Sequence, residues 1–305
     1  MPVPNSPLSF KVDVAPSLAA VIDLALAEDG ALQDITSTLA LDPAKLGRAV
    51  VRTRESMTLA GVGIIELLAK RVPRVRVIEG ALCDGTRVEA GAVLGGVEGP
   101  LHSILSIERV LLNLLGLACA TASITRSYVD AVDGTSAKIL DTRKTLPGLR
   151  MLQKYAVQCG GGVTHRLGLH DAVLLKDNHL AGLIPREIAA MVSNLSTHAR
   201  THPPFGLAPQ FICCEVDSLE QLDALLQLPI GVLDIVLVDN FSVIDLREAV
   251  ARRNQLQPSL QLEASGGVRL ETVRAIAQTG VDRISVGALT HSVRWTDIGL
   301  DIDSV

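Results

Sequence analysis

The chain has 305 residues, of which 48% are hydrophobic and only 2% aromatic, so it can form two modest domains with aliphatic cores. A net charge of −5 argues against nucleic acid or an anionic membrane surface as the main partner. The five cysteines show no C-x-x-C pair and no metal-ligand spacing, which predicts reduced thiols in a cytosolic compartment.

The amino-terminal segment lacks the apolar region of a signal peptide, and no apolar run reaches the about 18 residues of a membrane span. We therefore expect a cytoplasmic protein. Residues 1–16 are rich in proline and are expected to form an extended lead-in.

Three short elements are expected next in the chain. Ser17 is the expected N-cap of a helix that ends near Ala27. The segment after it reads as a turn in which Thr36 or Ser37 caps one further helical turn. From there the pattern predicts a small α/β sandwich, with strands at 49–53 and 74–78 and a helix at 63–71.

A helix is expected from Ser103 to about Leu115, because apolar residues cover it nearly all round, as in a buried helix. Glu108 and Arg109 interrupt this apolar surface. They are either members of surface ion pairs, or Arg109 is exposed because it acts at an interface or a site.

From Lys138 onward, strands and helices alternate with short connections. The expected strands are 138–140, 171–175, 210–216, 234–238, 260–264 and 282–286, and the expected helices are 185–195, 218–228, 243–253 and 270–278. Residues 196–209 are expected to form a loop. Such alternation predicts either a doubly wound sheet or a closed barrel. We favour a barrel with fewer strands than a complete (β/α)₈ barrel.

The predicted strands end in polar or glycine-rich sequences. If the strands are parallel, these ends meet on one face, which is where α/β sheets bind ligands. The ends carry Arg143 and Lys144, Lys176, Glu215 and Asp217, Asp239 and Asn240, Ser265-Gly266-Gly267, and Gly287. Basic residues in a mildly acidic chain predict a small, strongly anionic ligand. The two glycine turns, the first followed by a helix, predict a phosphate group on it.

Two acidic residues, Glu215 and Asp239, are predicted to face this basic wall. They either bind Mg²⁺ or sugar hydroxyls, or form ion pairs with the basic residues of the same face. Arg143 and Arg166 can each bind a carboxylate or phosphate with two hydrogen bonds. His165, beside Arg166, is more often a hydrogen-bonding loop residue than a catalyst.

An ordered set of motifs resembles the quinolinate phosphoribosyltransferase family. The motifs are DTRKT-x-PGLR from Asp141, KYAV-x-x-GGG from Lys154, HR-x-GL from His165, KDNH from Lys176, EV at Glu215, VDN from Val238, EASGG from Glu263 and VGALTHS from Val286. ERVLLN from Glu108 and DITS from Asp34 also fit. The chain departs from the family at Thr164, where most relatives have Asn, and in a segment after Asn113 that is about two residues short.

The resemblance implies a Mg²⁺-dependent reaction of quinolinate with phosphoribosyl pyrophosphate that gives nicotinate mononucleotide, pyrophosphate and CO₂, a step of NAD biosynthesis. It also implies an amino-terminal open α/β sandwich (residues 1–120, joined by 290–305) and an incomplete α/β barrel (residues 121–289). The implied assembly is a homodimer with shared active sites.

The family's functional residues carry over by motif. The implied substrate-binding residues are Arg109, Thr142, Arg143, Lys144, His165, Arg166, Lys176, Glu215, Asp239, Ser265, Gly266, Gly267, Val286, Gly287, Ala288 and His291. Among them Lys144, Lys176, Glu215 and Asp239 are the implied catalytic residues, and Glu215 and Asp239 the implied metal ligands. The resemblance places Arg109 against quinolinate from the neighbouring subunit, and the glycine turns with His291 at the 5′-phosphate.

Two other hypotheses stay open at this point. A related phosphoribosyltransferase acting on another acidic ring, such as the molybdenum-transport-associated relatives, would share the fold. A sensor that binds the nucleotide without catalysis would be a different class of protein.

Overall fold

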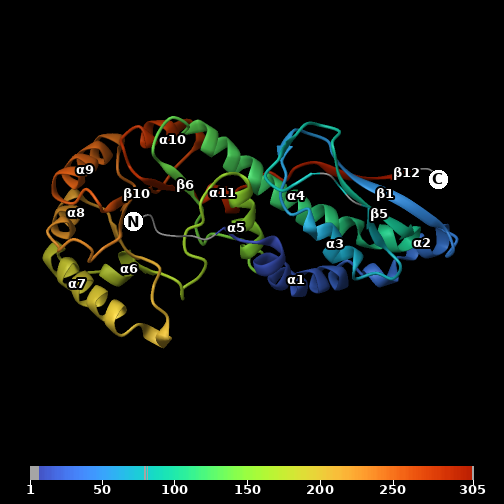
Figure 1. Cartoon of the computed structure of the whole chain (residues 1–305), viewed down its shortest axis with the longest axis horizontal. Helices are drawn as coiled ribbons and strands as arrows, with labels where there is room; N and C mark the ends of the chain where they lie inside the picture. The colour runs from blue at the N-terminus through green and yellow to red at the C-terminus, as the bar shows by residue number, and fades with distance from the viewer. Residues whose placement is uncertain (1–6, 79, 81, 304–305) are drawn as a thin grey trace. The chain divides into compact units, whose positions relative to one another are not determined.

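The computed structural model describes residues 7–78, 80 and 82–303, and the chain divides into two compact units, each treated by itself (Figure 1). The sandwich unit contains Pro7–Arg126, Lys144–Gly162 and the segment from Leu289 onward, and the barrel unit contains Ser127–Arg143 and Val163–Ala288. Part of the expected lead-in, residues 1–6, lies outside the described residues. Residues 144–162, which we expected in the barrel domain, group with the sandwich unit.

The predicted elements occur in the expected order, with further strands and helices among them that were not predicted, such as Val93–Pro100, Arg150–Cys159 and Ile298–Asp303. The helices are α1 (Ala15–Glu28), α2 (Ile35–Ala40), α3 (Gly63–Ala69), α4 (Leu101–Ala131), α5 (Arg150–Cys159), α6 (Asp177–Leu180), α7 (Pro185–Thr201), α8 (Leu219–Leu226), α9 (Val243–Leu256), α10 (Leu270–Ala277) and α11 (Ala288–His291). The strands are β1 (Leu46–Thr53), β2 (Met57–Thr58), β3 (Arg76–Ile78), β4 (Arg87–Val88), β5 (Val93–Pro100), β6 (Lys138–Leu140), β7 (Val173–Leu175), β8 (Ile212–Val216), β9 (Ile235–Asp239), β10 (Gln261–Ser265), β11 (Arg283–Ser285) and β12 (Ile298–Asp303).

The sandwich unit is built on an antiparallel sheet with the strand order β12-β1-β5-β3. Its core is aliphatic, as the composition predicts, and packs Val51 of β1 with Ile64 and Leu68 of α3 and with Leu111 of α4. Arg52 and Arg54 both form ion pairs with Asp301, which holds β12 against β1 from the solvent side. The last described strand is therefore an integral member of the first sheet.

Helix α4 is much longer than the helix expected from the sequence. It continues without interruption to Ala131, including the segment after Asn113 that is short relative to the family. Among the described residues it is the one helix with the length and composition to cross a membrane, but 72% of its most apolar window is buried. Because Ile104, Leu111 and Leu115 belong to the sandwich core, α4 is a core helix.

The barrel unit contains a parallel sheet with the strand order β6-β11-β10-β9-β8-β7. Strands β7 to β11 are neighbours in sequence order, and β6 then pairs with β11 rather than with β7. In a doubly wound sheet the chain starts near the middle, and the later strands are added first toward one edge and then toward the other. The continuous order seen here, with β6 next to β11, instead confirms the incomplete barrel. Figure 1 shows α7 to α10 in an arc around the strands. The sheet is open between β6 and β7, and one bridge from Val163 to Leu140 extends it at the β6 edge.

Alternate residues of the barrel strands point inward. Phe211, Cys213, Ile235 and Leu237 form an apolar cluster. The adjacent strands β10 and β11 instead carry buried charged residues on paired positions, Glu263 and Arg283. The interior of the barrel is thus apolar on one side and ionic on the other.

Three local expectations were wrong. Helix α1 begins at Ala15 after a short π-helical turn (Phe10–Val14), so Ser17 lies inside it and its hydroxyl donates to the carbonyl oxygen of Val14. The cap of α2 is Asp34, whose Oδ1 accepts the Ser37 N–H at 3.0 Å. The expected loop from residue 196 is helical as far as Thr201, because α7 continues.

Candidate active site

The predicted strand ends meet on one edge of the barrel, because β6 to β11 are all parallel. Within the barrel unit this edge carries Thr142, Arg143, Lys176, Glu215, Asp239, Ser265, Gly266, Gly267, Val286, Gly287 and Ala288. The structure therefore brings together most of the residues singled out from the sequence. Lys144, His291 and Arg109 belong to the sandwich unit.

Arg143 and Arg166 form a cationic pair within this unit. Arg166 is buried, and burial lowers the pKa of its guanidinium, which the neighbouring Arg143 guanidinium lowers further. The Nε of Arg143 is buried and has no hydrogen-bond partner among the described residues. Asp171, the nearest acidic influence on Arg166, accepts the backbone N–H groups of Leu167 and Gly168 at 2.7 and 3.0 Å. Two adjacent guanidinium groups for which the described part of the chain shows no carboxylate within ion-pair distance are suited to bind an anion.

His165 is held by the fold on every side. Its backbone N–H donates to Asp141 Oδ1 at 2.8 Å, and its Nδ1 accepts the Arg166 N–H at 2.8 Å. Its ring meets Phe211 edge-on, with centroids 5.3 Å apart, and its Nε2 lies 3.3 Å from Glu263 Oε1. With Nδ1 used as an acceptor, Nε2 is the ring nitrogen that faces Glu263. The ring thus supports the loop that presents Arg166.

Glu263 is a charged residue buried inside the barrel. It is fully buried, its Oε2 accepts Arg283 Nε at 2.7 Å, and its Oε1 accepts the Ser285 hydroxyl. Burial acts to raise the pKa of this carboxyl, but the His165 imidazole, the Arg283 guanidinium and the Ser285 hydroxyl together hold it well below its usual range. Glu263 therefore stays ionised beneath the site edge.

The two predicted acids lie beside a cavity of about 370 Å³. Its lining includes the carboxylates of Asp177, Glu215, Asp217 and Asp239. Glu215 forms an ion pair with Lys176, so the pairing considered from the sequence is present in this structure. Asn240 Nδ2 donates to Asp239 Oδ2 at 2.6 Å. No group of three His, Cys, Asp or Glu side chains among the described residues is arranged to hold a metal by itself. Paired carboxylates suit Mg²⁺ when substrate phosphates complete its coordination.

The turn after β10 requires glycine. Gly266 and Gly267 have φ of +89° and +58°, and a Cβ on Gly266 would overlap the side-chain oxygen of Asn240. Asn240 is itself in the left-handed region, with φ of +58°, and donates its N–H to the Ser265 carbonyl at 2.9 Å. The ends of β9 and β10 are thus locked together, with their backbone close to the surface where a phosphate would bind.

In the sandwich unit, Lys144 and His291 are exposed and their segments are joined by a hydrogen bond, which Thr290 Oγ1 donates to the Lys144 carbonyl at 2.7 Å. Arg109 lies on α4 and its side chain is exposed, although most of the neighbouring residues of this helix are apolar.

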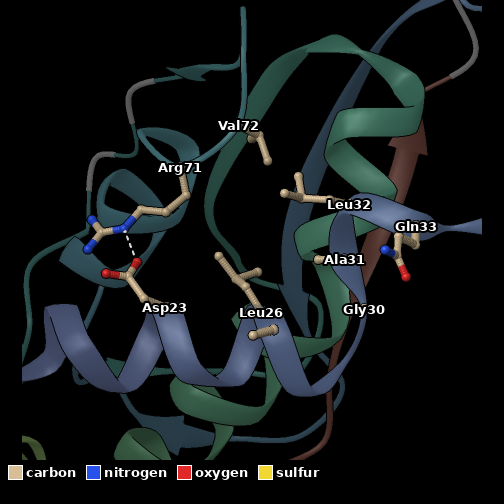
Figure 2. A pocket seen from close by; sticks show the side chains of 9 residues that line it. Asp23, Leu26, Gly30, Ala31, Leu32, Gln33, Arg71 and Val72 are labelled. Atoms are coloured by element: carbon tan, nitrogen blue, oxygen red, sulfur yellow. Dashed lines mark hydrogen bonds and ion pairs between the residues drawn. The ribbon is translucent and has the colours of Figure 1, made fainter.

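A larger cavity, of about 460 Å³, lies within the sandwich unit beside α1 and the turn after it (Figure 2). Apolar side chains such as Leu26, Leu32 and Val72 line it. Its one cation, Arg71, already donates to Asp23 Oδ1 at 3.0 Å. This cavity lacks the free positive charge that a strongly anionic ligand needs.

Sequence reasoning missed several residues that shape the site. Asp177 and Glu263 were seen only as parts of motifs, Asn240 was placed at a strand end without a role, and Gln153 and Thr290 were given no role. The alternation of side chains along the predicted strand 260–264 indicates that Glu263 points inward. A buried carboxylate needs hydrogen-bond or ionic partners, so this position could have been recognised as important. The other missed residues contact backbone atoms or residues distant in sequence, and no local sequence pattern predicts such contacts.

A partial parallel barrel whose edge combines a guanidinium pair, paired acids and glycine turns defines an enzyme that handles phosphorylated, multiply anionic substrates. The family models named "Quinolinate phosphoribosyl transferase" match here, the N-terminal domain over residues 34–119 and the C-terminal domain over residues 121–301. A carboxylating nicotinate-nucleotide pyrophosphorylase of Mycobacterium leprae is 44% identical over 274 residues, which cover 88% of this chain and 91% of the relative. A decarboxylating quinolinate phosphoribosyltransferase of Nicotiana glauca is 37% identical over 297 residues, covering 94% and 83%.

Among solved structures, the nicotinate-nucleotide pyrophosphorylase from Francisella tularensis superposes with a TM-score of 0.84 at 33% identity, covering 98% of this chain and all of that one. These matches span nearly the whole chain and agree with one another. The chain belongs to the quinolinate phosphoribosyl transferase family.

Proposed function

We propose that this protein transfers the phosphoribosyl group of phosphoribosyl pyrophosphate to quinolinate and releases pyrophosphate and CO₂, forming nicotinate mononucleotide. The observation that carries the proposal is the Arg143–Arg166 pair, next to the paired acids on the same barrel edge. Quinolinate is a dianion, and its two carboxylates match two guanidinium groups that form no ion pair with a carboxylate among the described residues.

The reaction makes separate demands on the two sides of the site. The bond from ribose C1 to pyrophosphate breaks as the pyridine nitrogen attacks C1, and negative charge collects on the leaving group. Lys144 and Lys176 are assigned to neutralise this charge, which is the kind of stabilisation that contributes most to catalysis. Glu215 is assigned to hold Lys176 in the absence of substrate and to face the ribose with Asp239 when substrate binds.

Decarboxylation follows from the new bond. Once the pyridine nitrogen is alkylated it is positively charged, so the electron pair left on C2 by departing CO₂ is stabilised, and C2 then takes a proton. No nucleophilic side chain is needed. Arg143 and Arg166 are assigned to orient the ring, and His165 and Glu263 to fix Arg166 from below.

Mg²⁺ is proposed as the cofactor, held by Glu215 and Asp239 together with the pyrophosphate of the substrate. Bound there, it would neutralise charge on the leaving group. The carboxylate-lined cavity supports this assignment, because hard oxygen ligands are those that Mg²⁺ prefers.

A homodimer with shared sites is also proposed. Arg109 is an exposed cation on a helix that is otherwise largely apolar, so a surface outside its own chain would explain it. In this proposal Arg109 reaches a quinolinate carboxylate of the neighbouring subunit.

One assay tests the reaction. Purified protein with Mg²⁺, quinolinate and phosphoribosyl pyrophosphate should release pyrophosphate and CO₂ in equal amounts. Pyrophosphate release without CO₂, from a different acidic ring, would point to a relative with another substrate. Binding of phosphoribosyl pyrophosphate without turnover of any acidic ring would instead point to a sensor.

A further inference from the structure

The segments that carry Lys144 and His291 are tied together by a closed set of hydrogen bonds within the sandwich unit. Thr290 Oγ1 donates to the Lys144 carbonyl at 2.7 Å. The Thr290 carbonyl accepts Gln153 Nε2 at 2.7 Å, and Gln153 Oε1 accepts the Leu146 N–H at 2.9 Å. The set therefore joins α11, the loop before α5, and α5 itself.

The members of this set are enclosed. Thr290 is 1% exposed and Gln153 is fully buried. Gln153 uses both ends of its amide, and the Thr290 hydroxyl donates to the carbonyl of a residue distant in sequence. A buried donor directed at one distant carbonyl fixes that carbonyl's position.

We infer that Thr290 is a positioning residue for Lys144, with Gln153 as the support of both. The inference rests on the proposed function, in which Lys144 binds the pyrophosphate side of the substrate and His291 the 5′-phosphate. A lysine side chain is long and flexible, so the place where its backbone is anchored affects how much conformational freedom the side chain must lose on binding. The Thr290 hydroxyl supplies that anchor, and it sets the spacing between two groups that bind opposite ends of one substrate.

Two substitutions separate this role from simple packing. Thr290→Val keeps the methyl group and removes the donor, whereas Thr290→Ser keeps the donor and removes the methyl group. We expect kcat/KM for phosphoribosyl pyrophosphate to fall about tenfold in Thr290→Val, equivalent to about 1.4 kcal/mol. The loss should appear mainly in KM for that substrate. Thr290→Ser should retain most of the wild-type value.

The matched control is Thr279→Val. Thr279 is also buried, and its hydroxyl also donates to a backbone carbonyl at 2.7 Å, but to Ile276 within its own turn. Its kinetics should stay within twofold of wild type. A double variant, Thr290→Val with Gln153→Met, should lose less than the product of the two single losses, because both act on one network.

The experiment combines initial-rate kinetics with calorimetric binding of inorganic pyrophosphate. If the serine variant loses as much as the valine variant, or if the valine variant matches wild type, the inference is overturned. If the Thr290→Val protein does not fold, Thr290→Cys is used in its place. It is compared with Thr290→Ser, because cysteine and serine are similar in size but the thiol is a much weaker hydrogen-bond donor than the hydroxyl. If wild type binds pyrophosphate but does not turn over quinolinate, the proposed function fails, and weaker pyrophosphate binding in the valine variant alone would still support the positioning role.

Discussion

Replacing Glu263 with glutamine should destabilise the barrel unit far more than the size of the change suggests. The substitution keeps the shape of the side chain but removes its charge, so the Arg283 guanidinium, 7% exposed, loses its ionic partner inside the barrel. Breaking a buried ion pair by removing one member costs about 3–5 kcal/mol, because the other charge is left buried. We expect the free energy of unfolding to fall by an amount in this range.

The loss should depend on pH in a defined direction. The pKa of Glu263 is lower in the folded protein than in the unfolded chain, because three partners outweigh the effect of burial. Such a group contributes stability that is present above its unfolded pKa, about 4.3, and is lost as pH falls toward the folded value. The stability difference between wild type and Glu263→Gln should therefore be largest near neutral pH and should narrow below about pH 4.

Urea unfolding followed by circular dichroism at several pH values measures both effects. Glu248→Gln is the matched control, because Glu248 is also paired with an arginine, Arg252, but on the exposed face of α9. It should change stability little at any pH. The reasoning would be refuted if Glu263→Gln unfolds at the same urea concentration as wild type near pH 7, or if its deficit grows on acidification.

Three further outcomes are expected. Lys176→Ala should remain folded, since its side chain is 44% exposed, while turnover falls about 10²–10³-fold in steady-state assays; a folded variant with near-normal rates would contradict its assignment. Nicotinate, which lacks the 2-carboxylate, should be a very poor substrate beside quinolinate, because the Arg143–Arg166 pair would be left partly unpaired; comparable turnover would indicate a site for monoacids. Inactive Arg109→Ala and Lys176→Ala proteins, unfolded together and refolded, should regain roughly a quarter of wild-type activity through mixed dimers; mixed dimers without activity would place Arg109 within its own site or outside any site.

The strand positions could be predicted from the sequence because short apolar runs that end in charge have few alternatives. The strand Lys138–Leu140 was predicted at its observed bounds. The polar residues that follow each predicted strand indicated which edge of the barrel carries the site. The resemblance gave the fold, since its motifs extend over nearly the whole chain.

Element lengths were less predictable, because packing decides them. Helix α4 continues past Leu115 through small residues that allow close approach, such as Ala122, whose carbonyl lies against Gly160. Helix α7 extends past the expected loop because Ser196 and Ala199 continue its buried face, and Ser196 Oγ donates to the Val232 carbonyl at 2.7 Å. Neither contact is visible in a local pattern.

The supports of the site were the least predictable part. Glu263 forms contacts with both His165 and Arg283. These contacts arise because the barrel brings the three residues together, and the spacing of the residues in the sequence does not predict them. The hydrogen bond from Thr290 to the Lys144 carbonyl joins residues 146 positions apart. The sequence shows which side chains can donate a hydrogen bond. Every residue has a backbone carbonyl that can accept one, so the sequence does not show which carbonyl is the partner.

The pairing of β12 with β1 has a consequence for how the protein is made. Asp303 lies opposite Arg48 in the register of this pair, so the first sheet gains its edge strand only after the long stretch of chain between β1 and β12 has been synthesised. At about 5–20 residues per second, β1 waits roughly 10–50 s for its partner on the ribosome. Strands β7 to β11 can pair in order as they emerge, because each neighbours the next in sequence. The sandwich unit is therefore completed after the barrel unit, and the β1 edge stays open to pairing with other chains until β12 is made.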